Sequence, residues 1–166
     1  WGLHVVASEP IGFDPVRARY ARGDLAGTVR IRQLDDDHTV AEIPGAGSRA
    51  YRAFFSPKGR FLAVTYGEPE RHSLRAWEIE SGRCAVGPLE DTCQQGVDFN
   101  PNEEQLAVGY RDGSVRLFSV SSGERVKMLL APGEYLPYRL RFAPQSPRLA
   151  VCFRKGPEHE VRILDL

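Results

Sequence analysis

The chain has 166 residues and a mass of 18.5 kDa, which is the size of one domain with a substantial core. Its 22 basic and 22 acidic side chains give zero net charge, whereas a free-standing nucleic-acid binder or a polybasic membrane module carries a basic excess. No apolar run approaches the roughly 20 residues of a membrane-spanning helix. We therefore expect neither a nucleic-acid nor a membrane partner.

The three cysteines, Cys84, Cys93 and Cys152, are odd in number and form no C-x-x-C pair. This argues against a disulfide framework and a structural zinc site, and it favours a reducing, cytoplasmic environment. The first residues carry neither the basic segment nor the long apolar segment of a signal peptide. Because Trp1 stands where an initiator Met would be, we expect a chain that is processed or excised from a longer one.

A pattern of three features recurs four times, after a short apolar stretch at residues 3–7 that predicts a strand of its own. Each copy has a Phe-x-Pro motif, a short apolar run and a strand that contains Val-Arg or Leu-Arg. The motifs begin at Phe13, Phe55, Phe99 and Phe142, so successive copies lie 42, 44 and 43 residues apart. We expect one domain over residues 1–166, with repeats at 9–45, 50–90, 94–131 and 137–166.

In the first two repeats the apolar run is degraded at residues 16–20 and complete at residues 61–64. Residues 35–38 (DDDH) are expected to form a polar turn, because they lack the ligand spacing and the glycine of a calcium loop. Residues 45–48 (GAGS) are not a phosphate loop, because a strand over residues 50–55 follows them where a helix would be needed.

The third repeat has four expected strands, and the fourth repeat stops after its third strand. In the third repeat, Asp112-Gly113 is expected to form a tight hairpin with positive φ at both central positions. No helix is expected, because no window sustains a helical stripe and 12 Pro and 16 Gly interrupt the chain. The strands expected in the third repeat cover residues 96–99, 105–110, 114–120 and 125–130.

These repeats resemble WD (tryptophan–aspartate) repeats, which read roughly F-S-P-D-G, then L-A-S-G-S, then D-G-T-V-R-L-W-D. Residues 51–64 (YRAFFSPKGRFLAV) are similar to the first half, and residues 106–120 (LAVGYRDGSVRLFSV) to the second. Residues 161–166 (VRILDL) are similar to the repeat end, with Asp165 at the position of the WD aspartate. The resemblance runs from about residue 9 to the end. It implies an all-β fold of about four β-propeller blades, each a four-stranded antiparallel sheet.

The polar tetrad of Asp, His, Ser and Trp that holds many WD blades is not matched in these repeats. Asp112 stands at the tetrad Asp, but Val108 replaces the Ser, Phe118 replaces the Trp, and no His precedes the first strand. Trp77 is the one Trp kept at its position. Because a partly satisfied buried network is worse than none, we expect apolar packing to hold these blades.

The number of blades leaves three arrangements open. Because WD-repeat propellers usually have seven or eight blades, the favoured expectation is a part of a larger propeller, with residues 3–7 as a strand of a preceding blade. A closed four-blade ring, in which residues 3–7 complete the fourth blade, is an alternative. The third arrangement is a half-ring that forms a homodimer of eight blades, since unpaired blade edges and faces would pair with something.

No pattern of catalytic, cofactor-binding or metal-ligating residues is present, so we expect no enzyme, no cofactor and no metal. The four histidines form neither H-E-x-x-H nor H-x-H. Residues 158–160 (EHE) are interpreted as part of a solvated loop between two strands. No G-x-S-x-G occurs, and no cysteine has a histidine at a recognisable spacing.

The function favoured by this reading is a non-catalytic scaffold that binds a protein partner, or other domains of its parent chain, through rim loops. The alternative is a regulatory or sensor propeller of a larger enzyme such as a bacterial kinase or NTPase. Arginine far outnumbers lysine, which fits either arginine anchors at an interface or a GC-rich genome. The four strands of a blade are lettered a to d in chain order. The resemblance implies docking on the rim formed by the d–a loops between blades and the b–c loops within them, where Arg and Tyr are typical anchors. The expected contact residues are Arg49, Tyr51, Arg71, Arg111, Tyr135 and Arg154.

Overall fold

The computed structural model describes residues 10–14, 16–68 and 71–166, and within them every regular element is a β-strand. The all-β fold is therefore confirmed, while the strand expected at residues 3–7 lies outside the described residues. In the described part of the chain, no helix is long and apolar enough to cross a membrane.

The strands form four antiparallel sheets, and within each sheet the strands pair in the order in which they follow one another in sequence. The first sheet contains β1 (Pro10–Asp14), β2 (Arg19–Gly23), β3 (Val29–Gln33) and β4 (Thr39–Ile43). The second contains β5 (Ala50–Phe55), β6 (Phe61–Glu68), β7 (Arg71–Glu78) and β8 (Cys84–Glu90). The third contains β9 (Thr92–Phe99), β10 (Gln105–Tyr110), β11 (Val115–Ser119) and β12 (Arg125–Leu130). The fourth has three described strands, β13 (Leu136–Phe142), β14 (Arg148–Lys155) and β15 (Glu158–Asp165).

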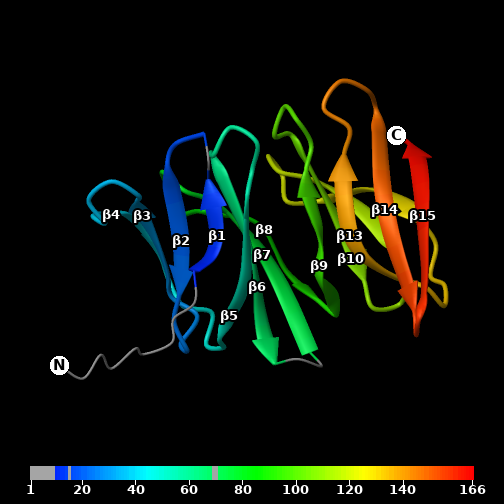
Figure 1. Ribbon diagram of the computed structural model, residues 1–166, viewed down its shortest axis with the longest axis horizontal. Coiled ribbons are helices and arrows are strands. Elements are labelled where there is room, and N and C mark those ends of the chain that lie inside the picture. Colours follow the sequence, from blue (N-terminus) through cyan, green and yellow to red (C-terminus); the bar gives the residue numbers. More distant parts are fainter. Residues whose placement is uncertain (1–9, 15, 69–70) are drawn as a thin grey trace.

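The sheets stand side by side in chain order, with the first and the fourth at opposite ends of the row (Figure 1). The first strands of neighbouring sheets adjoin: β1 lies against β5, β5 against β9, and β9 against β13. Each of these strands ends at the Phe of a Phe-x-Pro motif or one residue after it. This is expected, because the Pro has no amide hydrogen to donate to a ladder. The four first strands therefore line one side of the row.

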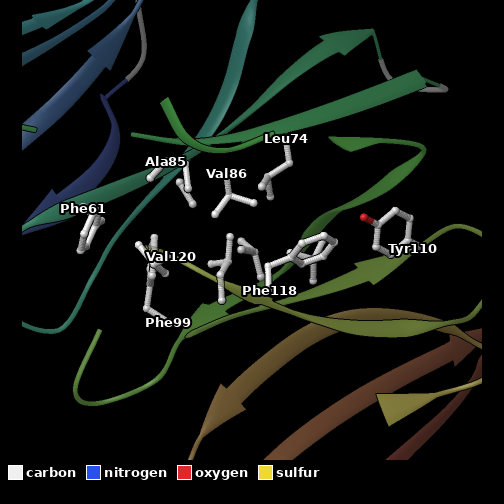
Figure 2. Close-up of a cluster of buried hydrophobic side chains, with 13 residues drawn as sticks. Phe61, Leu74, Ala85, Val86, Phe99, Tyr110, Phe118 and Val120 are labelled. Carbon is white, nitrogen blue, oxygen red and sulfur yellow. The ribbon is translucent and has the colours of Figure 1, made fainter. Parts of the chain in front are cut away.

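Apolar side chains fill the space between each pair of neighbouring sheets. Figure 2 shows the layer between the second and third sheets, where Leu74 and Val86 lie across from Phe118 and Val120. A second cluster joins the first and second sheets, and a third joins the third and fourth. Because one small sheet cannot cover both of its faces, each sheet depends on its neighbours for burial.

The sheets are equivalent in register, so their exposed and buried faces can be compared directly. The aligned Ala–x pairs on strands two and three are Ala21–Ile31, Ala63–Ala76, Ala107–Leu117 and Ala150–Ile163. In the first three sheets this face is covered by the next sheet, and Val29, Leu74 and Val115 are fully buried. In the fourth sheet the equivalent Val161 is 63 % exposed and Ile163 is 60 % exposed.

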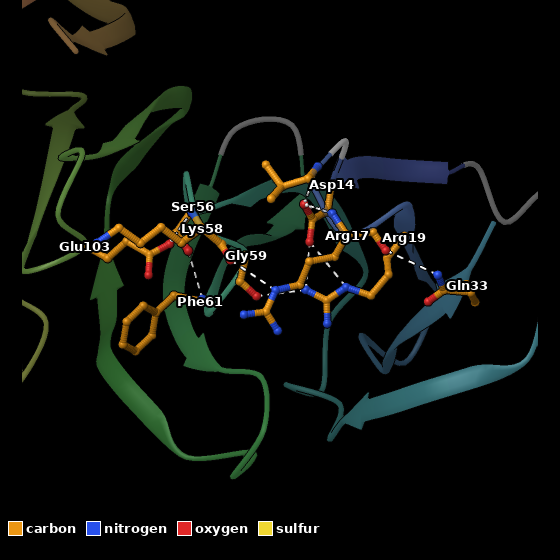
Figure 3. A network of polar contacts seen from close by, with 10 residues as sticks. Asp14, Arg17, Arg19, Gln33, Ser56, Lys58, Gly59, Phe61 and Glu103 are labelled. Atoms are coloured by element: carbon orange, nitrogen blue, oxygen red, sulfur yellow. Dashed lines mark hydrogen bonds and ion pairs between the residues drawn. The ribbon is translucent and has the colours of Figure 1, made fainter.

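Polar contacts between the a–b turns tie the first three sheets together at one edge (Figure 3). Arg19 is buried, forms an ion pair with Asp14 at 2.7 Å and donates to the Gly59 carbonyl of the second sheet at 2.8 Å. The Lys58 amide in turn donates to the Glu103 carboxylate of the third sheet at 2.6 Å. Glu103 has a φ of +66°, a left-handed conformation that is strained for a residue other than glycine.

The absence of the polar tetrad is confirmed in the third sheet. Val108 and Phe118 are buried in the apolar cluster, and Asp112 pairs with Arg116 instead of a histidine. Trp77, the retained Trp, donates its Nε1 hydrogen to the hydroxyl of Tyr66 at 3.1 Å.

Three local predictions are corrected by the structure. The first strand of the third repeat begins at Thr92 instead of residue 96, because Thr92 pairs with Tyr110 across a bulge. The turn at Asp112-Gly113 has positive φ only at Gly113 (+85°), since Gly113 N donates to Tyr110 O and closes a three-residue loop. Residues 158–160 lie in β15 and not in a loop, because the turn is confined to Gly156 and its neighbour, and Lys155 already pairs with Glu158.

Candidate functional site

A hollow opens at the rim where the second, third and fourth sheets meet, and we call it the rim hollow. Its volume is about 210 Å³, and its walls come from the d–a and b–c ends of the strands. Two arginines stand on it, Arg111 from the turn between β10 and β11 and Arg154 near the end of β14. The remaining lining residues are His72, Cys93, Gln95, Leu136 and Tyr138.

Backbone hydrogen bonds fix the loops around the rim hollow. The Arg111 amide donates to the Asp91 carbonyl at 2.9 Å, and the Gly133 amide donates to the Asp112 carbonyl at 2.8 Å. The d–a connections on both sides of the third sheet are thus bound to its b–c turn. A site on loops held in this way needs little ordering when a partner binds.

The start of β13 is held against the third sheet by a close backbone approach. A side chain at Gly96 or Gly109 would meet the Pro137 carbonyl oxygen, at 2.3 and 2.6 Å from an added Cβ. Only glycine lets these backbones approach so closely. This contact sets Leu136 and Tyr138 on the wall of the rim hollow.

Among the described residues, no Asp or Glu lines the rim hollow and its two arginines are unengaged, so this part of its lining is electropositive. Neither the Arg111 nor the Arg154 guanidinium forms an ion pair or hydrogen bond with the described residues. The nearby Asp112 is already neutralised by Arg116 at 2.8 Å. Burial raises the pKa of Asp112, but hydrogen bonds from Ser114 and the charge of Arg116 outweigh it, so the pKa is lowered overall.

The single thiol in the rim hollow is unsuited to nucleophilic chemistry. Burial raises the pKa of Cys93 to about 12, and the nearby Arg111 offsets this only in part. The thiol is therefore protonated at neutral pH, whereas a catalytic cysteine reacts as the thiolate. Among the described residues, no group of three or more His, Cys, Asp or Glu side chains is arranged to hold a metal ion.

The structure separates the six expected contact residues. Arg111 and Arg154 both line the rim hollow. Tyr51 lies beside it, with its ring 5.4 Å from that of His72. Tyr135 is turned elsewhere and donates to Glu158 at 2.9 Å, and this hydrogen bond raises its pKa.

The remaining two residues do not join this group. Arg49 is exposed ahead of β5 and is absent from the lining, although its carbonyl accepts a hydrogen bond from Gly67. The side chain of Arg71 lies outside the described residues. Partner binding by all six stays a prediction.

Five lining residues were not expected from the sequence, namely His72, Cys93, Gln95, Leu136 and Tyr138. For Tyr138 the repeats contain a signal that marks it. It lies four residues before Phe142, as Tyr51 lies four before Phe55 and Gln95 four before Phe99. The ring of Tyr138 meets that of His159 edge to face at 5.8 Å. Repeat alignment therefore identifies this offset as one that faces the rim.

A second hollow, of about 450 Å³, lies further along the same first strands, and we call it the inner hollow. Gln95 lines both hollows. Three arginines line the inner hollow, and of these Arg141 is ion-paired with Asp98 at 2.9 Å. The full lining comprises Arg52, Phe54, Gln95, Val97, Arg139, Leu140, Arg141, Ala150 and Cys152.

A larger hollow, of about 570 Å³, lies at the opposite edge by the a–b turns, and its three arginines have partners. Arg19 is paired with Asp14, Arg60 with Glu78, and the Arg17 side chain donates to the Lys58 carbonyl. The bonds from Arg17 to the Lys58 carbonyl and from Arg19 to the Gly59 carbonyl join the first sheet to the second, so this hollow is a structural junction.

Comparisons with known proteins agree with the repeats. The family described as the anaphase-promoting complex subunit 4 WD40 domain matches residues 71–134. WD repeat-containing protein VIP3 of Arabidopsis thaliana is 28% identical over 163 residues, covering 89% of this chain and 48% of that protein. Telomerase protein component 1 of Rattus norvegicus is 31% identical over 104 residues, covering 62% of this chain and 4% of that protein. The chain thus spans about half of the first relative and a small part of the second.

Solved structures give the same fold. The β-propeller domain of Myceliophteria thermophila Cps50 (Swd1) superposes with a TM-score of 0.69 at 18% identity, covering 95% of this chain and 51% of that one. The computationally designed Ika4 protein also gives a TM-score of 0.69, at 14% identity, covering 98% of this chain and 94% of that one. The four sheets are therefore β-propeller blades.

Proposed function

Because this chain belongs to the WD-repeat β-propeller family, we propose that it is a non-catalytic scaffold that binds a protein partner through the rim hollow. The observation that carries the proposal is the pair Arg111 and Arg154, from two different blades, on one hollow whose described lining contains no carboxylate. Arginine and tyrosine are the side chains that most often anchor protein interfaces, and Tyr138 stands beside them.

The geometry favours binding over catalysis at this place. Cys93 is held as a thiol, and the described residues of the lining include no carboxylate to act as a general base. Arg111, on a turn, and Arg154, near the end of β14, are instead charged donors on a fixed backbone, which suits recognition. None of the relatives described above is named as a kinase or an NTPase, so the regulatory-domain alternative has no support from them.

Panning a library of displayed random peptides against the purified chain tests the proposal. Peptides enriched on the wild type should lose binding to an R111A/R154A variant, because both anchors are then gone. They should keep binding to R125A, a matched control that removes an exposed arginine from the outer strand β12. Failure to enrich any peptide, or enriched peptides that bind R111A/R154A as well as wild type, refutes the proposal.

The ends of the row support a second part of the proposal, on assembly. The outer face of the fourth blade carries Val161 and Ile163 at positions that the next blade buries elsewhere. We propose that residues 10–166 form one propeller segment and that this face packs against an apolar β-sheet, in the same chain or in a partner. The first blade of a second copy is a poor match, because its outer face presents Arg22, Arg30 and Arg32.

Sedimentation velocity distinguishes these assemblies. The isolated chain should self-associate weakly through the fourth blade, and a V161D/I163D variant should abolish that association. A closed dimer of fixed mass that dissociates on R32D substitution contradicts this part of the proposal, because it requires the first blade at the contact.

A further inference from the structure

We infer that the segment bound by this face is an acidic, extended peptide that runs from the rim hollow into the inner hollow. This inference rests on the proposed function and adds the chemistry of the partner. It follows from how the charges of an overall neutral chain are distributed over its hollows.

Arginines gather on the two hollows without matching acids. Arg111 and Arg154 stand on the rim hollow, and Arg52, Arg139 and Arg141 on the inner hollow, and no Asp or Glu is among the described residues of either lining. Only one of these five guanidinium groups, that of Arg141, is ion-paired within the described residues. The hollow at the opposite edge shows the contrast, because Glu80 and Glu103 line it together with its cations.

The two hollows form one path. Gln95 lines both, and β13 supplies lining residues to both, from Leu136 and Tyr138 at the rim to Arg139 and Arg141 further in. Arg139 and Arg141 lie two residues apart on one strand, so their side chains leave the same face about 7 Å apart. Arg141 contacts Asp98 through Nη1 and is still 75% exposed, so it can face a peptide as well. Alternate side chains of an extended peptide have the same spacing, so two acidic residues at alternate positions match this pair.

Arginine is suited to carboxylates in particular. Its planar fork makes two parallel hydrogen bonds with a carboxylate, and such charge-assisted bonds are stronger than neutral ones. The apolar floor of the inner hollow, formed by Phe54, Val97 and Leu140, accepts the aliphatic parts of a peptide. A single-stranded nucleic acid fits less well, because the zero net charge gives no attraction at long range.

The chemistry can be tested by fluorescence anisotropy with three labelled probes. The first is a decapeptide of alternating Glu and Thr, the second is the same peptide with Gln for Glu, and the third is an oligothymidylate of equal length. The Glu peptide should bind, and the Gln peptide should bind at least about tenfold more weakly, a difference of about 1.4 kcal/mol. Raising the salt concentration should weaken the binding of the Glu peptide, because salt screens the attraction between opposite charges.

Two double variants test the path. R111Q/R154Q and R52Q/R139Q should each lower the affinity for the Glu peptide by about tenfold or more. The matched control R125Q should leave that affinity unchanged. Arg141 is left intact, so that Asp98 keeps its partner. A circular dichroism spectrum like that of wild type shows that each variant is folded.

Each contrary result has a defined meaning. Equal binding of the Gln peptide, or no binding of the Glu peptide, refutes the acidic partner, while the library experiment still decides whether a peptide binds at Arg111 and Arg154. If R111Q/R154Q weakens the binding of the Glu peptide but R52Q/R139Q does not, the path into the inner hollow is refuted. Tighter binding of the oligothymidylate through the same arginines refutes a peptide partner in favour of a nucleic acid.

Discussion

Replacing Arg19 with methionine should lower the free energy of unfolding by about 3–5 kcal/mol, because it leaves the Asp14 carboxylate buried without its cation. Arg19 Nη2 lies 2.7 Å from Asp14 Oδ2, and the two side chains are only 6% and 1% exposed. The same guanidinium donates to the Gly59 carbonyl of the next blade, which also loses its donor. Since a domain of this kind is stable by about 5–15 kcal/mol, the loss is a large share of the total.

The repeat supplies a matched control. Arg148 lies two residues before Ala150, as Arg19 lies two before Ala21, and it forms an ion pair with Asp165 at 3.0 Å. That pair is 60% and 84% exposed, so Arg148→Met should cost less than about 1 kcal/mol. The two variants thus remove the same side chain from equivalent positions and differ in burial.

Urea unfolding followed by the fluorescence of Trp77 measures both variants, in a Trp1→Phe background. Trp77 lies in the apolar cluster between the first and second blades, which Arg19 bridges. A D14N/R19M variant should be more stable than R19M, because it removes the buried charge and keeps an oxygen for the Val16 amide. An R19M loss as small as that of R148M, or a D14N/R19M variant less stable than R19M, refutes the reasoning.

Three further predictions concern single side chains. In urea unfolding, the free energy of unfolding of Glu103→Gly should be about 1 kcal/mol higher than that of Glu103→Ala. Both variants lose the hydrogen bond from the Lys58 amide, but only alanine is strained by the positive φ at this position. Tyr66→Phe should cost about 1–3 kcal/mol by the same assay, because the Trp77 Nε1 hydrogen is left buried without an acceptor. The pKa of Asp112 is lowered in the fold, so the contribution of its carboxylate to stability is present above the unfolded pKa of about 4 and is lost as the pH falls below that value. As the pH is lowered across this range, the urea midpoint of Asp112→Asn should therefore fall less than that of the wild type.

The repeat spacing predicted most of the fold because burial dictates it. The strands expected at residues 105–110 and 125–130 are β10 and β12 with the same bounds, since alternating apolar runs and turn residues mark both ends. The early start of β9 could not be predicted, because the bulge opposite Tyr110 lies where Pro137 of another blade approaches Gly96. Local sequence does not record a contact of that range.

The site was predictable only in part, for a similar reason. Arg111 and Arg154 were identified because Arg111 follows the second strand of its repeat and Arg154 lies near the end of the equivalent strand, and these ends of neighbouring blades meet at one rim. Tyr135 is not among the lining residues of the rim hollow and donates to Glu158 of β15, a contact between residues 23 apart that local sequence does not record. The charge imbalance of the hollows also needed the structure, since it depends on which arginines have partners.

The excess of arginine over lysine now has a structural cause at one recurring position. The third strand of each of the last three blades carries an arginine that lies over an aromatic ring of that blade, as Arg116 does 3.8 Å from the ring centre of Tyr110. A lysine would lack the planar group that stacks on a ring, so the aromatic neighbours themselves favour arginine there. In the first blade the equivalent Arg30 faces Arg22 instead of an aromatic ring, and it is held by Glu42 at 2.8 Å. The arginine therefore reinforces the last three blades through the pairs Arg75–Tyr66, Arg116–Tyr110 and Arg162–Phe153.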